Sequence, residues 1–228
     1  MRTSLVRSLM AFLALALGLA VALAQAPQGG AAGGGQGRGG AGGAGGAGGG
    51  QGRGGGRGGP VLMVTSSAWP DGGEVPQKHA GRGGNMSPAF ELKWVTGGNN
   101  ALPDAMPPAT LASYVIILHD IENAPRGGEP DTLHWLIWNI PGTTKTLPEG
   151  LPMGDLPDGS RQTTTNVGRG SYFGPGAGPG PFHHYVFEFY ALDTKLDLPA
   201  TATRAQVVAA MEGHVVGKSA FVGRFHGQ

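Results

Sequence analysis

Six short runs of apolar or alternating residues lie between Val61 and Phe225, and Pro-, Gly- and Asn-rich connections separate them. Runs of this length and residue type predict β-strands. The runs are VLMVTS, FELKWV, SYVIILHD, LHWLIWNI, HHYVFEFYALD and SAFVGRF, and they begin at Val61, Phe90, Ser113, Leu133, His183 and Ser219. Such a series is typical of an antiparallel sandwich or barrel-like sheet rather than of repeated βαβ units.

One segment, TRAQVVAAMEGHVVG, predicts an α-helix. Thr203 is the expected N-cap and Gly217 the expected stop. An apolar stripe runs along the segment and consists of Val207, Val208, Met211 and Val215. The sequence therefore predicts a mainly β domain with one late helix.

The first 26 residues are typical of an export signal. Arg2 and Arg7 precede an unbroken apolar run from Leu9 to Leu23, and small residues surround its end. A retained membrane anchor is the alternative, but the run is shorter than the ~20 residues that a spanning helix needs. We expect residues 1–26 to be a signal peptide and the mature protein to be periplasmic or secreted, without stable membrane insertion. Since the chain has no cysteine, lipoprotein acylation is excluded and the fold must be stable without disulfides.

Residues 27–60 are almost wholly Gly, Ala, Gln and Arg, and they lack the large apolar side chains that would offset the entropy of backbone ordering. A disordered Gly/Arg-rich linker is therefore expected. Its Arg-Gly-Gly pieces resemble RNA-binding segments, but three spaced arginines are a weak footprint for nucleic acid. The domain expected over residues 61–228 contains 11 of the 16 Lys and Arg residues and all 15 acids, so its charge is about −4 and no nucleic-acid partner is expected.

Ionisable residues stand at the ends of three predicted strands. Asp120 ends one strand, His134 lies near the start of another, and His183 begins a third. Because the end of one antiparallel strand lies beside the start of its neighbour, these side chains are expected to converge at one edge of the sheet. Alternation places His183 on the apolar face with Tyr185, so His183 rather than His184 is expected to face a cavity.

A segment rich in Gly, Pro, Asp, Ser and Thr runs from Leu147 to Pro181. Long loops inside compact domains commonly line a site, so this segment is expected to form the rim of a pocket. Two imidazoles oriented by a carboxylate can donate hydrogen bonds to a phosphate or carboxylate, and glycine amides of the rim can supply further donors. The alternative is that each histidine only caps its own strand through a local hydrogen bond.

Four pieces of the chain also carry a family pattern in their order and spacing. They are NMSPAFELKW, LHWLIWNIPG, SYFGPGAGPGPFHHYVFEFYALD and LDLPATATRAQVVAAMEGHVVGKSAFVGRF, and they begin at Asn85, Leu133, Ser171 and Leu196. With them, the stretch from about Gly84 to Phe225 resembles the phosphatidylethanolamine-binding protein family, in its bacterial branch of Raf kinase inhibitor-like proteins. The resemblance implies an antiparallel β-sandwich with a C-terminal helix and a small pocket for phosphate-like anions.

The resemblance also implies the ligand-binding residues. The positions that match the acidic loop, the His-Trp pair, the Gly-Pro segment and the His-Arg-Tyr strand start of the family are Asp120, His134, Gly174, Pro175, His183 and Tyr185. Three departures leave the pocket's geometry open. Ile121 replaces the first Pro of the acidic loop, Glu122 or Asn123 stands where a second Asp would be, and His184 replaces the Arg.

These features predict an exported binding module for a small anion or a phospholipid headgroup such as phosphorylethanolamine, with no catalytic residue, metal or cofactor. An inhibitor-like protein that acts on an extracytoplasmic protease or kinase is an alternative that the family name suggests. A zinc hydrolase is a third reading, with His119, Asp120, His134 and His183 as candidate ligands. Against it, the adjacent His119 and Asp120 should point to opposite faces of their strand.

Overall fold

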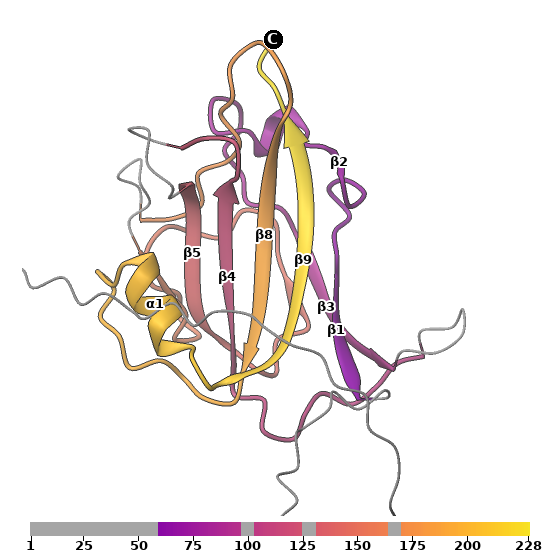
Figure 1. Ribbon diagram of the computed structural model, residues 1–228, viewed down its shortest axis with the longest axis vertical. Coiled ribbons are helices and arrows are strands. Elements are labelled where there is room, and N and C mark those ends of the chain that lie inside the picture. The colour runs from indigo at the N-terminus through magenta and orange to yellow at the C-terminus, as the bar shows by residue number, and fades with distance from the viewer. Residues whose placement is uncertain (1–58, 97–102, 125–130, 164–169) are drawn as a thin grey trace, which may run out of the picture. The chain divides into compact units, whose positions relative to one another are not determined.

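Each of the six apolar runs forms a strand, and in the described part of the chain three two-residue strands complete two sheets (Figure 1). The smaller sheet has the order β1 (Pro60–Thr65), β3 (Phe90–Thr96) and β6 (Thr146–Leu147). The larger sheet has the order β2 (Gly73–Glu74), β9 (Val215–Phe225), β8 (His183–Leu192), β4 (Ser113–Asp120), β5 (Thr132–Pro141) and β7 (Arg161–Gln162). Neighbouring strands are antiparallel, except that β2 pairs with β9 in parallel.

The computed structural model describes residues 59–96, 103–124, 131–163 and 170–228, which lie within one unit, Gly52–Gln228. The predicted signal peptide over residues 1–26 lies outside the described residues, and so does the predicted linker over residues 27–60 except for its last two residues. Two helical elements are described, the 3-10 helix η1 (Gln77–His79) and the α-helix α1 (Arg204–Ala210). Neither of them is long and apolar enough to span a membrane.

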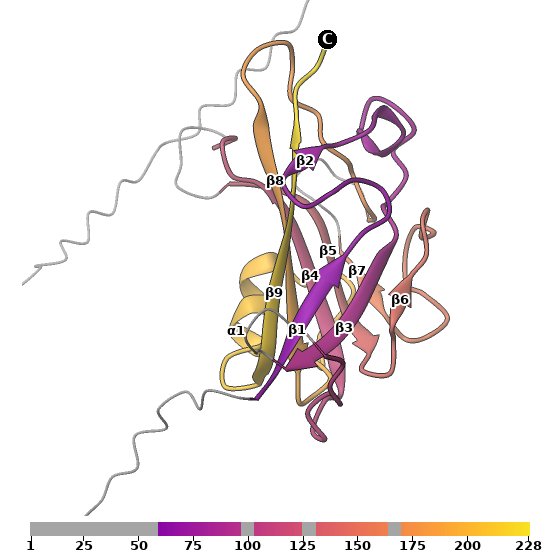
Figure 2. The ribbon, with the colours of Figure 1, turned by 90° about the vertical axis from the view of Figure 1, so that its right-hand side faces the viewer.

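The large sheet is covered on both faces (Figure 2). Ile116 and Leu118 of β4 pack toward the small sheet, whereas Val115 and Ile117 pack toward α1. Every residue of β4 is therefore buried, which explains why its sequence is a continuous apolar run rather than an alternating one. The predicted mainly β sandwich is confirmed.

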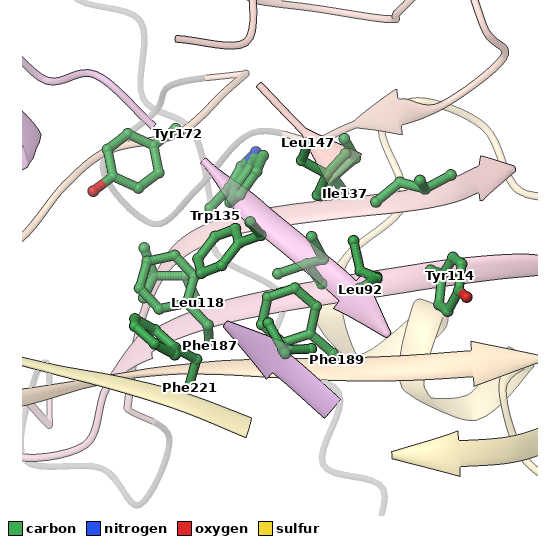
Figure 3. Close-up of a cluster of buried hydrophobic side chains, with 14 of the residues drawn as sticks. Leu92, Tyr114, Leu118, Trp135, Ile137, Leu147, Tyr172, Phe187, Phe189 and Phe221 are labelled. Carbon is green, nitrogen blue, oxygen red and sulfur yellow. The ribbon is translucent and has the colours of Figure 1, made fainter. Parts of the chain in front are cut away.

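Aromatic rings fill the space between the two sheets (Figure 3). Phe90 of β3 contacts Phe187 and Phe189 of β8 and Phe221 of β9, with ring centroids 5.0 to 5.5 Å apart in edge-on geometry. Rings in this geometry contribute about 0.5–1.5 kcal/mol per pair beyond the burial of their area. In a domain without cysteine, burial of apolar surface such as these rings is the main stabilising term.

The helix begins where predicted but ends early. Thr203 is its N-cap and forms a capping box with Gln206. The predicted stop at Gly217 is wrong, because α1 ends at Ala210 and the chain turns at Gly213, where φ is +80°. Gly217 belongs to β9, which pairs with β8. The helix is consequently not the C-terminal element, since the eleven residues of β9 follow it.

Replacement of Gly217 by Ala is expected to destabilise the protein by about 1–3 kcal/mol, the usual cost of overpacking a core. A Cβ at this position would lie 2.4 Å from Cη2 of Trp94. That ring is held in place because its Nε1 donates to the Tyr114 hydroxyl at 3.0 Å. The control is Gly178→Ala, whose added Cβ would meet no atom within 4 Å. Equal free energies of unfolding for the two variants in urea titrations would contradict this account.

Candidate functional site

Three strand ends meet at one edge of the large sheet, at the top of Figure 1. Asp120 ends β4, His183 begins β8, and His134 is the third residue of β5. Because β4 runs antiparallel to both β5 and β8, the structure brings these three residues together. Tyr185 is the partner of Asp120 across the β4–β8 pairing, so all four candidate strand residues lie at this edge.

A β-bulge determines which way His134 points. Consecutive residues of β4 pair with Trp135 and with Leu133, so His134 is an extra residue of β5. Strict alternation would put His134 on the same face as Leu136, which packs toward α1. The imidazole instead lies edge-on to the ring of Tyr185 on the other face, with centroids 5.2 Å apart. The bulge therefore turns the histidine away from the helix and toward Asp120.

The carboxylate of Asp120 is the centre of the site's hydrogen bonds. The residue is 2% exposed. Its oxygens accept from Nδ1 of His183 at 2.8 and 3.0 Å and from the backbone amides of Glu122 and Asn123, both at 3.1 Å. These bonds orient the His183 ring and fix the start of the loop that follows β4. His184 lies on the exposed side, where its Nδ1 is 2.6 Å from Oε1 of Glu122, so alternation correctly separates the two histidines.

His134 is held by the rim. Its Nδ1 lies 2.8 Å from the carbonyl oxygen of Phe173 and 3.2 Å from that of Gly174. Since both partners only accept, this nitrogen carries the hydrogen. The ring also stacks on Phe173, with centroids 5.6 Å apart and planes 11° from parallel. Burial lowers the pKa of His134, while the Phe173 carbonyl and the Asp120 carboxylate oppose that shift.

Tyr185 connects the strand to the rim. Its hydroxyl oxygen accepts from the backbone amides of Gly176 and Ala177 at 3.2 and 3.0 Å. Burial raises the pKa of Tyr185 well above its ordinary value, and the Asp120 carboxylate reinforces the shift while the Gly176 amide opposes it. The expectation that glycine amides of the rim are free to bind a ligand is therefore wrong for Gly176, because its amide, like that of Ala177, already donates to the phenol.

Gly174 and Pro175 support the pocket from behind. The amide of Gly174 donates to Oδ1 of Asn85 at 2.9 Å, and its Cβ, if present, would lie 1.9 Å from the carbonyl oxygen of His79. Only glycine fits this approach. The carbonyl of Pro175 accepts from the amide of Gly81 at 2.8 Å. Gly174 thus holds His134 through its carbonyl, and Pro175 holds the loop after η1. The next two rim residues, Gly176 and Ala177, line the cavity.

A cavity of about 260 Å³ opens between these groups. Its lining consists of Arg82, Asp120, Asn123, Thr132, His134, Phe173, Gly176, Ala177, His183 and Tyr185. Sequence reasoning missed Arg82, which lies in the loop after η1 and far from any strand end. In the sequence, only the family resemblance of the neighbouring NMSP piece pointed to this loop. The loop reaches the cavity through tertiary contacts with the rim, which a local sequence pattern does not predict.

The histidine before Asp120 takes no part in this cavity. His119 points to the other face of β4, where its ring contacts the carboxylate of Asp131 and lies 3.7 Å from Oε2 of Glu188. The zinc set that includes both His119 and Asp120 is therefore not assembled. A different set has ligand atoms within 4.8 Å of one another, namely Asp120, Glu122 and His183. In this set the His183 nitrogen and the Glu122 oxygens already bond to Asp120 and His184.

Comparison with known proteins agrees with the fold and with the resemblance noted in the sequence. A family model described as phosphatidylethanolamine-binding protein matches residues 65–226. The UPF0098 protein of Methanothermobacter thermautotrophicus is 36% identical over 165 residues, which cover 72% of this chain and 98% of that protein. The UPF0098 protein YbhB of Escherichia coli is 31% identical over 172 residues, with 72% and 99% covered.

A solved structure gives the same result for the fold. The crystal structure of a phosphatidylethanolamine-binding protein homolog from Chlamydia trachomatis superposes with a TM-score of 0.61 at 24% identity, and covers 74% of this chain and 99% of that one. The match shows the same fold, and the family model and the sequence relatives show that the chain belongs to the phosphatidylethanolamine-binding protein family, in its bacterial YbhB-type branch.

Proposed function

We propose that this protein is a binding module that holds a small anion, phosphate or a phosphate-bearing headgroup, at the edge where β4, β5 and β8 meet. One observation carries the proposal: two imidazoles line a single cavity, and each is oriented by an acceptor behind it. Asp120 holds His183, and two rim carbonyls hold His134. Arg82 adds a positive charge to the same lining. Ring nitrogens of fixed orientation give a phosphate specific hydrogen-bond partners, and the guanidinium beside them supplies the charge that attracts an anion.

The size of the cavity favours a small ligand. Its volume of about 260 Å³ is below the ~300–1,000 Å³ of most small-molecule sites. Phosphate or phosphorylethanolamine fits such a space, but the acyl chains of a phospholipid do not. A lipid ligand would therefore place only its headgroup in the pocket.

The lining supports binding rather than hydrolysis. Thr132 and Tyr185 carry the hydroxyl groups of the described lining. The Thr132 hydroxyl donates to the carbonyl of Asn123 at 3.1 Å, and that of Tyr185 accepts from two amides. Neither is held by a histidine, as an activated nucleophile would be.

The ligand or partner would be extracytoplasmic, because the N-terminal pattern of residues 1–26 is that of an export signal. The alternative role, inhibition of an extracytoplasmic protease or kinase, would use a protein surface rather than the cavity. A substitution in the cavity would distinguish the two roles. If the protein is an inhibitor, the substitution would abolish anion binding but leave the protease or kinase bound.

Phosphate and phosphorylethanolamine at millimolar concentration are expected to raise the melting temperature and to shift the imidazole resonances of His134 and His183. A ligand that binds only the native state stabilises it by about 2.7 kcal/mol at 100 times its Kd. His134→Ala should abolish both responses. The control is His214→Ala, since His214 is exposed and pairs with Asp193, and this variant should respond as the wild type does.

Unchanged spectra of the wild type at millimolar ligand would refute the binding proposal. Metal analysis of the purified protein separates it from the zinc reading, because stoichiometric zinc would favour a metal site at Asp120, Glu122 and His183 instead.

The stability of the protein is expected to depend on the protonation of His134. Burial holds the folded-state pKa of its ring below the ordinary 6.5. Between the two values the unfolded chain binds a proton that the folded protein does not, so this contribution to stability is present above pH ~6.5 and is lost as the pH falls through the folded pKa. The free energy of unfolding should thus fall more from pH 7.5 to 5.5 in the wild type than in His134→Gln. Equal losses in urea titrations at the two pH values would contradict the assignment.

A further inference from the structure

The neutral donors around the cavity are mostly used by the protein itself. The amides of Gly176 and Ala177 donate to the Tyr185 hydroxyl, and the Thr132 hydroxyl donates to a carbonyl. Burial keeps the hydrogen on the phenol of Tyr185 by raising its pKa, and the side-chain hydrogen bond of this phenol to Asp120 uses that hydrogen. Asn123 also lines the cavity, and apart from its side-chain amide an anion that enters finds few neutral groups ready to donate to it.

The imidazoles present acceptors as long as they are neutral. In His134 the hydrogen lies on Nδ1, which faces two carbonyl oxygens, and in neutral His183 it lies on the Nδ1 that faces Asp120. The second nitrogen of each ring, Nε2, then carries a lone pair. His134 remains neutral at neutral pH, because burial lowers the pKa of its ring. A bare anionic oxygen would meet a lone pair there instead of a hydrogen.

Arg82 is the cation of the cavity lining that the structure describes. Its side chain is exposed, and within the described residues it has neither an ion pair nor a side-chain hydrogen bond. Its backbone is anchored, because the amide of the preceding Gly81 donates to Pro175 at 2.8 Å and the carbonyl of Ala80 accepts from two later amides of the loop. A free guanidinium on an anchored loop is suited to meet an incoming charge.

We propose that the pocket selects phosphates that carry a P–OH group, namely phosphate monoesters and inorganic phosphate, over phosphodiesters. When the ligand is a monoanion, the guanidinium of Arg82 pairs with its negative charge, and the ligand's own P–OH donates a hydrogen bond to Nε2 of His134. A phosphodiester has the same charge but no P–OH, so its oxygens would leave the ring nitrogen unpaired. The inference rests on the proposed function and narrows it, because the phosphate of an intact phosphatidylethanolamine is a diester whereas that of free phosphorylethanolamine is a monoester.

The ionisable groups that face this ligand come from three strands and one loop. They are Asp120 from β4, His134 from β5, His183 and Tyr185 from β8, and Arg82 from the loop after η1. His119, on the other face of β4, disfavours a charge on His134. If a ring rather than the ligand supplied the hydrogen, monoesters and diesters would both bind better at low pH. A comparison of monoester and diester binding therefore shows whether the ligand or an imidazole supplies the hydrogen of the bond.

The test is a calorimetric titration of the full chain with methyl phosphate and with dimethyl phosphate at pH 5.5 and pH 8. Methyl phosphate should bind at least tenfold more tightly than dimethyl phosphate at pH 5.5. It should weaken at pH 8, where a monoester has lost its last proton, whose pKa is about 6. Arg82→Gln should weaken methyl phosphate binding about tenfold or more, as expected for the loss of one charge-assisted contact. Lys145→Gln, which removes an exposed charge beyond the far end of β5, should not.

Each outcome decides between the two proposals. Equal affinities for methyl and dimethyl phosphate would overturn the monoester selectivity and leave the binding module intact. Unchanged affinity in Arg82→Gln would overturn the role of Arg82. If neither phosphate bound at either pH, the proposed function itself would fail, and the selectivity with it.

Discussion

A buried carboxylate requires hydrogen-bond donors around it, because the free energy lost when its charge leaves water is large and only such bonds offset it. Asp120 satisfies this requirement with two backbone amides of the loop after β4 and with the ring of His183. Tyr185, opposite it in the sheet, has a pKa raised by burial and further by the same carboxylate. The path of the loop and the tautomer of neutral His183 thus both depend on one side chain. The candidate site is organised around this group rather than around any single histidine.

His134 reaches the site through two local departures from regular structure. One extra residue in β5 rotates the imidazole from the helix side of the sheet to the cavity side. On the other side, Gly174 allows the rim to approach the carbonyl of His79 and to place two carbonyl oxygens against the ring. A regular strand and a rim residue with a Cβ would each separate the ring from these acceptors. Bulges next to functional sites commonly have this effect.

The positive charge of the pocket has an unexpected origin. The resemblance assigns an Arg to the position of His184, and the ring of that residue instead contacts Glu122 on the exposed side of β8. Arg82 lines the cavity from a different loop, which contacts the rim through Gly81 and Asn85. In the proposed function, the residue that recognises the charge of the ligand and the histidine His183 therefore come from different elements, the loop after η1 and β8. His184 and Glu122 contact each other outside the lining of the cavity.

Local pattern was sufficient for the six long strands, the start of α1, the face of His183 and the edge at which Asp120 and His134 lie. These features depend on side-chain period, strand direction and capping, all of which are properties of neighbouring residues. The sequence offered two glycines that could end α1, Gly213 and Gly217. The pairing of Val215 and Gly217 with β8 shows that the helix ends before the first of them. The inward turn of His134, the occupied amides of Gly176 and Ala177 and the arrival of Arg82 were likewise decided by the tertiary structure. Each of these depends on contacts between segments far apart in the chain, whose register and approach no local pattern encodes.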